Sequence, residues 1–162
     1  MNAATLPAEI RHYISGHLEE VFSTMLSMQL ATTATAEPVK FAGERVTGSV
    51  GIAGDTITGQ VYLHLSAPFA AKGTAAMLGM AIEEISGPAE VNDVIGEVTN
   101  MVAGGLKSWL CDSGSACALT TPAVIRGTSF SVMPKPGVEQ IFIAFECGAD
   151  HGLLEIHVRH NS

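Results

Sequence analysis

Positively charged side chains are scarce in this sequence. Its 162 residues include eight Lys and Arg against sixteen Asp and Glu, so the formal net charge at pH 7 is −8. The basic residues are spread from Arg11 to Arg159 and form no stripe that could follow a phosphate backbone. This excludes the usual electrostatic basis for binding nucleic acid or an anionic membrane surface, and we expect neither as a partner.

The sequence also lacks long apolar runs and a cysteine framework. No segment has the length of uninterrupted apolar residues that a membrane-spanning helix requires. Residues 1–30 carry Arg11, Glu19 and Glu20 within their apolar pattern, which is untypical of a signal peptide. The three cysteines are odd in number and have no metal-like spacing, as is common in a reducing compartment. We therefore expect a soluble protein in the cytoplasm.

Hydrophobic residues, in contrast, are plentiful. They make up 47% of the chain, whereas charged residues make up only 15%. Such a composition excludes a disordered chain, and a chain of 162 residues is long enough to bury a sizeable core. We expect a single domain over residues 1–162.

Helix-forming and strand-forming patterns alternate along the chain. Apolar residues at helical spacing, with proline, serine or glycine at the ends, predict helices over residues 7–31, 66–79 and 87–114. The segment TTATAEP that follows the first helix is expected only to end it. β-Branched and aromatic residues predict strands over residues 44–53, 56–65, 117–126, 138–147 and 153–160. This order favours an α+β fold with antiparallel strand pairing.

The last predicted strand shows a regular alternation. Leu154, Ile156 and Val158 alternate with three polar residues, Glu155, His157 and Arg159. Because neighbouring side chains of a strand point to opposite faces, we expect the polar side of this strand to face solvent.

A short internal likeness leaves a duplication open. EVFSTML at residues 20–26 resembles EVTNMVA at residues 97–103, and β-like segments follow both long helices. In a duplicated fold, Ser23 would stand in the first half where Asn100 stands in the second. The alternative is a chance similarity between two amphipathic helices.

One face of the third helix carries an unusual set of polar residues. At about 100° per residue, Asp93, Glu97, Asn100 and Gly104 fall within about 60° of one another. The apolar residues of this helix fall on the opposite side. Three polar side chains therefore form a row of about two turns, roughly 10 Å long.

The glycine and the charge of this face both suit a partner surface. A glycine inside a helix costs about 1 kcal/mol relative to alanine, and Gly104 leaves room beside the polar row. No Lys or Arg occurs between Lys72 and Lys107, so the face is acidic and attracts a cationic feature of a partner. The alternative interpretation is a solvated helix face without a binding role.

At these residues the chain resembles the CheC/CheX family of chemotaxis phosphatases. The family motif is Asp or Ser, three residues, Glu, two residues, Asn, 22 residues and Pro. Asp93, Glu97 and Asn100 match its spacing, MVAGGLKSWL follows as in the family, and Pro122 comes after 21 intervening residues. The first helix has Ser23 but no matching Asn, so the chain looks like the single-motif CheX branch.

The resemblance implies a fold and an activity. The fold would be CheC/CheX-like, an antiparallel β-sheet packed with two long helices. The activity would be hydrolysis of the aspartyl phosphate on a CheY-like response-regulator receiver domain, in chemotaxis or another two-component pathway. Asn100 would orient the attacking water, Glu97 would pair with the receiver's active-site lysine, and Asp93 and Gly104 would be binding residues.

The resemblance also implies partners and cofactors. The chain would need no metal or cofactor of its own, because the receiver domain supplies Mg²⁺ to neutralise the phosphoryl oxygens. A homodimer is implied as well. The alternative to an enzyme is a non-catalytic receiver-binding adaptor, similar to interaction modules of the flagellar switch, and the Glu97/Asn100 pair favours the enzyme.

Overall fold

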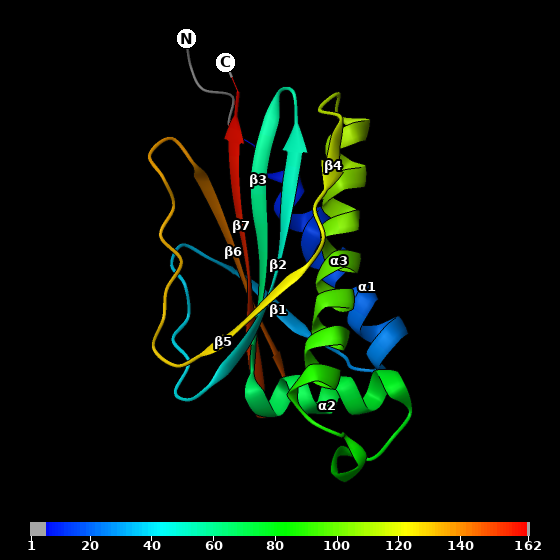
Figure 1. The fold of residues 1–162 in the computed structure, drawn as a ribbon. Helices are drawn as coiled ribbons and strands as arrows, with labels where there is room; N and C mark the ends of the chain where they lie inside the picture. Colours follow the sequence, from blue (N-terminus) through cyan, green and yellow to red (C-terminus); the bar gives the residue numbers. More distant parts are fainter. Residues whose placement is uncertain (1–5, 162) are drawn as a thin grey trace.

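An antiparallel β-sheet with helices on one face forms the framework of the protein (Figure 1). The computed structural model describes residues 6–161. Its helices are α1 (Glu9–Leu26), α2 (Ala67–Leu78), the 3-10 helix η1 (Ile82–Glu84) and α3 (Pro88–Asp112). Its strands are β1 (Ala31–Thr35), β2 (Arg45–Gly54), β3 (Ile57–Ser66), β4 (Cys117–Leu119), β5 (Ala123–Gly127), β6 (Glu139–Cys147) and β7 (Asp150–His160). The predicted α+β class, with an antiparallel sheet and two long helices, is confirmed.

The strand order has an internal symmetry. The strands run β1-β6-β7-β3-β2-β4, and β5 also pairs with β2. Exchanging the half from α1 to β3 with the half from α3 to β7 places β1 on β5, β6 on β2 and β7 on β3. The same strand pairs form after this exchange, all of them antiparallel. This is the arrangement expected of the internal duplication that the sequence left open.

The helices enclose the main hydrophobic core against one face of the sheet. Apolar residues spaced three and four apart give each long helix a buried stripe. Phe22 of α1, Phe69 of α2 and Phe145 of β6 meet between these layers, with ring centroids 5.4 to 5.9 Å apart. Such tilted and edge-on contacts stabilise aromatic clusters beyond the area they bury. The core therefore joins α1, α2 and the sheet.

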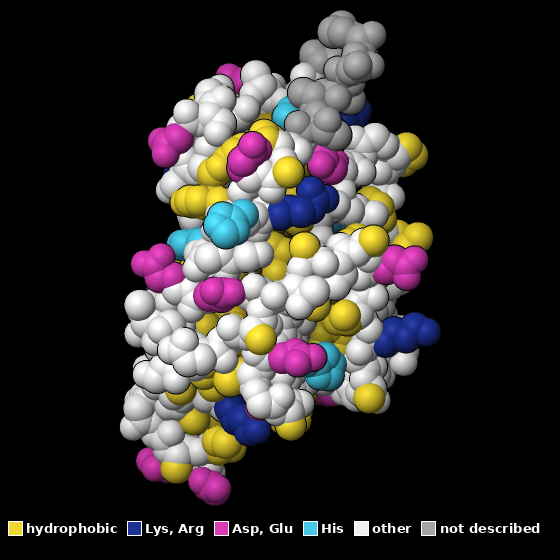
Figure 2. All heavy atoms as spheres, turned by 180° about the vertical axis from the view of Figure 1, so that it is seen from behind, with side chains coloured by type: hydrophobic (Ala, Val, Ile, Leu, Met, Phe, Trp, Pro, Cys, Tyr) yellow, Lys and Arg dark blue, Asp and Glu magenta, His cyan; other side chains and the backbone are white. Residues whose placement is uncertain are grey.

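The face of the protein opposite to the view of Figure 1 carries charges of both signs. On the face shown in Figure 2, acidic, basic and histidine side chains are scattered among one another, without a basic stripe. Within the described part of the chain, no helix combines the length and the apolar character needed to cross a membrane.

A glycine of β2 lets α3 lie directly on the sheet. A Cβ atom added to Gly48 of β2 would overlap the side chain of Thr99 and lie 3.2 Å from the carbonyl oxygen of Ile95. Thr99 is fully buried, and its hydroxyl donates a hydrogen bond to the Ile95 carbonyl oxygen at 2.7 Å. Because Thr99 precedes Asn100, this contact fixes the height and rotation of α3 at the last side chain of its polar row.

Gly48→Ala is expected to lower the free energy of unfolding by about 2 kcal/mol, the usual cost of overpacking a well-filled site. The matched control is Gly16→Ala in α1, where an added Cβ meets no heavy atom within 4 Å. That change is expected to raise stability by up to about 1 kcal/mol, since alanine is the better helix former. Urea unfolding measures both; equal effects of the two changes would contradict the close packing of Gly48.

The structure corrects three element predictions. Residues 32–38 were expected only to end the first helix, but Ala31–Thr35 form β1, paired with β6. α1 ends earlier than predicted, at Leu26, where Ser27 has a positive φ of 53°. The predicted strand 117–126 is divided into β4 and β5, because Pro122 has no backbone N–H for the ladder. The remaining strands and helices lie within a few residues of their predicted positions.

The prediction that the polar side of the last strand faces solvent was wrong for Glu155 and His157, whereas Arg159 is exposed as expected. Glu155 and His157 of β7 are only 4% and 6% exposed. The loops over residues 36–44 and 128–138 cover the sheet face that lies opposite the helices (Figure 1). The two oxygens of Glu155 accept hydrogen bonds from Nε2 of His64 at 3.0 Å and from Nε2 of His157 at 2.6 Å. The polar alternation thus builds a buried hydrogen-bonded network.

This network makes the protein sensitive to acid. Burial alone would raise the pKa of Glu155, but hydrogen bonds from His157 and His64 outweigh it and lower the pKa to about 2. The unfolded chain titrates near its ordinary value, so stability from Glu155 is present above about pH 4.5 and is lost as the pH falls toward 2.

Glu155→Gln is therefore expected to lower the free energy of unfolding at pH 7 by about 3 kcal/mol. The same change should flatten the loss of stability between about pH 4.5 and 2, since the titrating carboxylate is gone. Urea unfolding at several pH values measures this. Glu146→Gln, at an exposed site on β6, is the control and should leave stability unchanged. An unaltered acid profile in Glu155→Gln would contradict the assignment.

Candidate functional site

The polar row predicted on the third helix lies on the exposed face of α3. Asp93, Glu97 and Asn100 are exposed, in agreement with the helical spacing of the sequence. The opposite side of α3 packs against the rest of the protein with these buried residues: Val91, Val94, Ile95, Gly96, Val98, Thr99, Val102, Ala103, Gly105, Leu106 and Leu110. A helix held along its whole length in this way presents its outer side chains from a rigid support.

The side chains of this row are free to meet a partner. Among residues 6–161, no ion pair involves Asp93 or Glu97. Within the same range, the side-chain hydrogen bonds on α3 are made by neighbours such as Asn92 and Thr99, and none is made by Asn100. Three exposed side chains in one line, without partners among the described residues, leave this face open to a binding partner.

A groove runs beside the row, between α3 and the segment that joins β4 to β5. Its volume is about 520 Å³, and it is open to solvent. It is lined by Asn92, Asp93, Gly96, Glu97, Asn100, Pro122 and Val124. Three of the four residues predicted for the site therefore share one depression, and Gly104 continues the same face one turn further along α3.

Pro122 lies in this groove although it comes one residue earlier than the motif requires. A Cβ atom added to Gly96 would lie 3.5 Å from Cβ of Pro122, so Pro122 lies directly beside this turn of α3. The division between β4 and β5 at residues 120–122 accommodates the shorter spacing. Pro122 therefore forms one wall of the groove, opposite the turn of α3 that carries Glu97 and Asn100.

Arg126 attaches this wall to α3. Its Nε donates to Oδ1 of Asn92 at 2.8 Å, and its Nη2 donates to the carbonyl oxygen of Pro88 at 3.4 Å. A third contact, at 3.4 Å, joins Arg126 to the exposed carboxylate of Glu44. These bonds hold β5 against the first turns of α3. Val124 of β5 and the preceding Pro122 are thereby held at the groove.

The adjacent glycines 104 and 105 of α3 have different surroundings. A Cβ atom on Gly104 would meet no heavy atom within 4 Å, so this position leaves open space beside the row, as predicted. A Cβ atom on Gly105 would overlap the imidazole ring of His17. Nε2 of His17 donates to the carbonyl oxygen of Met101 at 2.9 Å. At Gly105 a side chain of α1 therefore approaches the backbone of α3 closely.

Sequence reasoning missed several residues of the groove. Asn92, Gly96 and Val124 lie in its lining, and Arg126 holds its wall. Asn92 and Gly96 are visible in the helical pattern, but nothing in that pattern indicates that β5 lies beside them. The proline of the family motif, Pro122, was the one signal in the sequence that could have pointed to the segment beside α3.

Metal-binding side chains do not gather at this site. In the part of the chain that the structure describes, there is no group of three or more His, Cys, Asp and Glu residues that could hold a metal ion.

His64 is fully engaged in the core, where the Thr47 hydroxyl donates to its Nδ1 at 2.8 Å and its Nε2 donates to Glu155. Burial lowers the pKa of His64 and keeps its ring neutral. The groove can therefore offer carboxylate, amide and apolar surface.

Comparison with solved structures finds the same fold in chemotaxis proteins. The chemotaxis protein CheX from Vibrio vulnificus is 28% identical, with a TM-score of 0.81 over 94% of this chain and 100% of that one. A CheC-like superfamily protein from Shewanella sp. PV-4 is 26% identical, with a TM-score of 0.81 over 95% and 99%. A CheX–CheY–BeF3–Mg²⁺ complex from Borrelia burgdorferi is 19% identical, with a TM-score of 0.77 over 92% and 97%. The last of these shows the fold alone.

A search of curated protein sequences found no match. Comparison with models of protein families agrees with the solved structures. The model of the family described as chemotaxis phosphatase CheX matches residues 46–146, which is more than half of the chain. This range includes the polar row of α3 and Pro122, and the fold it implies is the one observed. The chain belongs to the CheX family of chemotaxis phosphatases.

Proposed function

We propose that this chain hydrolyses the aspartyl phosphate of a CheY-like receiver domain, which docks on the groove beside α3. The observation that carries the proposal is the pair Glu97 and Asn100, one turn apart on a rigid helix, exposed and without partners in the described part of the protein. The Borrelia burgdorferi relative was crystallised in a complex with CheY. A receiver domain is therefore the partner that best suits this face.

The chemistry explains why an amide is needed. Water attacks the phosphorus, the bond between phosphorus and the receiver's aspartyl oxygen breaks, and the products are inorganic phosphate and a free carboxylate. The acyl phosphate is already reactive, so the main requirement is a water molecule held in line with the bond that breaks. The Asn100 amide can donate to and accept from that water. A carboxylate at the same place would be repelled by the phosphoryl oxygens.

Glu97 has a separate role in this proposal. Its carboxylate pairs with the active-site lysine of the receiver and fixes the register in which Asn100 enters the phosphorylated pocket. Asp93 contacts the receiver at the rim of the groove. Gly104 leaves space for the receiver's surface at the other end of the row, where an added side chain would project into the interface.

The cation in this reaction belongs to the receiver. Mg²⁺ bound there neutralises the phosphoryl oxygens, and the Borrelia burgdorferi complex contains Mg²⁺ together with CheY. We propose that this chain contributes no metal of its own. A homodimer, a cytoplasmic location and a role in chemotaxis stay predictions that accompany the proposed function.

A turnover experiment separates an enzyme from an adaptor. Receivers from the same cell are tested by pull-down in phosphorylated and unphosphorylated form, and any that bind are used as substrate. At a molar ratio of about one chain to twenty receivers, an enzyme clears the whole phosphorylated population at an accelerated rate. An adaptor affects at most the fraction it binds. Loss of phosphate limited to that fraction would contradict the proposed activity.

A further inference from the structure

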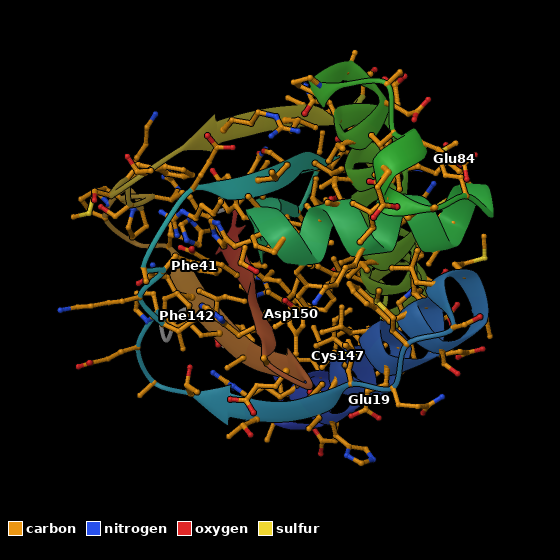
Figure 3. All side chains as sticks on the ribbon, turned by 90° about the horizontal axis from the view of Figure 1, so that it is seen from below. Glu19, Phe41, Glu84, Phe142, Cys147 and Asp150 are labelled. Carbon is orange, nitrogen blue, oxygen red and sulfur yellow. The ribbon has the colours of Figure 1, made fainter. Side chains whose placement is uncertain are left out.

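A second hollow lies on the opposite face of the sheet, away from α3. It occupies about 620 Å³ between the sheet and the loops over residues 36–41 and 129–134. Figure 3 shows Phe41 and Phe142 on this side of the sheet, with the helices on the other side. The volume is within the range of small-molecule sites, which are mostly apolar and contain a few fixed polar groups.

Arg45 is the buried cation of this cavity, which Glu37, Lys40 and Glu155 also line. Only 7% of the residue is exposed. Its guanidinium packs on the ring of Phe130, 3.7 Å from the centroid, and lies 5.2 Å from the centroid of Phe41. Across residues 6–161, no side-chain hydrogen bond or ion pair is made by Arg45. A buried guanidinium with stacked faces and unpaired N–H groups is a site prepared for an anion.

The buried carboxylate of the cavity does not serve as a dedicated partner for Arg45. Glu155 also lines the cavity, but its Oε1 accepts from His64 and its Oε2 accepts from His157. Its charge favours the protonated form of Arg45 from a distance, while burial lowers the pKa of Arg45. The N–H groups of the guanidinium therefore remain available, and an anion bound there would lie near one fixed negative charge.

The remaining walls of the cavity indicate what the uncharged part of a ligand would be. They are mainly apolar, with the side chains of Val39, Phe41, Phe130, Val132, Pro134 and Phe142. Met133, which is 81% exposed, stands at the rim. One buried cation next to Glu155 suits a singly charged anion better than a phosphate dianion. A planar carboxylate fits a guanidinium through two parallel hydrogen bonds.

We propose that this cavity binds a small organic carboxylate, whose carboxylate group pairs with Arg45 and whose apolar body packs against Phe41, Phe130 and Phe142. The site is separated from the docking groove by the sheet, and it does not depend on the function proposed for α3. Gln140, whose side chain also lines the cavity, offers an amide for a second polar contact.

The test uses phenylacetate as the probe and phenylacetamide as its uncharged counterpart. Binding to the full chain is followed by two-dimensional NMR with isotope-labelled protein. Phenylacetate is expected to bind saturably, with a Kd of the order of 1 mM for so small a ligand, and to shift signals of residues that line the cavity. Phenylacetamide should bind at least about tenfold more weakly, because it cannot form the charged pair.

Two variants at cationic residues sharpen the result. Arg45→Met keeps the length of the side chain and removes its charge, and should weaken phenylacetate binding by about tenfold or more. Lys40→Met removes a cation from the cavity wall and should change binding by less than about twofold. The comparison of the two ligands on the unaltered protein remains decisive should Arg45→Met fail to fold.

Three results would overturn the proposal. The first is the absence of saturable carboxylate binding, and the second is equal binding of phenylacetate and phenylacetamide. The third is that the cavity signals respond to protein dilution and not to phenylacetate. That outcome would show that a second copy of the chain, rather than a small ligand, covers this face.

Discussion

Asn100→Ala is expected to lower the rate of receiver dephosphorylation by two to three orders of magnitude, equivalent to about 3–4 kcal/mol of transition-state stabilisation. The side chain is exposed on a helix whose other face is fully packed, so its removal disturbs neither the fold nor the rest of the groove. Binding of the receiver should change little, because the amide acts on the attacking water. Decay of phosphorylated receiver and an independent binding titration measure the two effects.

Two comparisons make this result specific. Asn100→Asp has nearly the same shape but adds a negative charge, and it should be as inactive as Asn100→Ala because it repels the phosphoryl group. Ser108→Ala, at another exposed position of α3, should keep the full rate. Equal decay with the unaltered protein and Asn100→Ala would remove the assigned role of the amide.

Glu97→Lys is expected to weaken receiver binding by about a hundredfold or more. The change replaces attraction to the receiver's lysine with repulsion, and charged pairs that are buried on binding are worth about 2–5 kcal/mol in comparable interfaces. Isothermal titration with a receiver activated by beryllofluoride and Mg²⁺ measures the affinity without turnover. The loss should remain substantial at physiological salt, because the interface shields the pair from solvent ions.

The control for this change is Glu20→Lys. Glu20 is exposed on α1, and its substitution alters the net charge by the same amount. The first half of the chain lacks the asparagine of the motif, so Glu20→Lys should alter affinity by less than about twofold. If both variants lose affinity equally, the receiver responds to net charge alone, and Glu97 has no specific partner.

Local periodicity explains how much of the site was predictable. Asp93, Glu97 and Asn100 share a face because of their spacing along one helix, and that relation holds wherever the helix packs. The same applies to the end of α2 at Gly79, where a positive φ of 65° suits glycine. By contrast, Pro122 and Val124 come to the groove through the pairing of β5 with β2, which no local pattern encodes.

The errors have a common physical cause. β1 consists of alanines and threonines without hydrophobic alternation, and it becomes a strand because β6 offers an unpaired edge. Glu155 and His157 do alternate with apolar residues, so the strand itself was predictable. Their burial depends on two loops that fold over the sheet. In both segments, contacts with parts of the chain that are distant in sequence decided whether the residues form a strand or are buried.

The most direct measurement is a structure of this chain with a receiver domain activated by beryllofluoride and Mg²⁺. The account predicts that the receiver covers the groove beside α3, with the Asn100 amide facing the beryllofluoride group and the Glu97 carboxylate paired with the receiver's lysine. A complex in which the receiver docks elsewhere, or in which residues 97 and 100 remain in solvent, would contradict it.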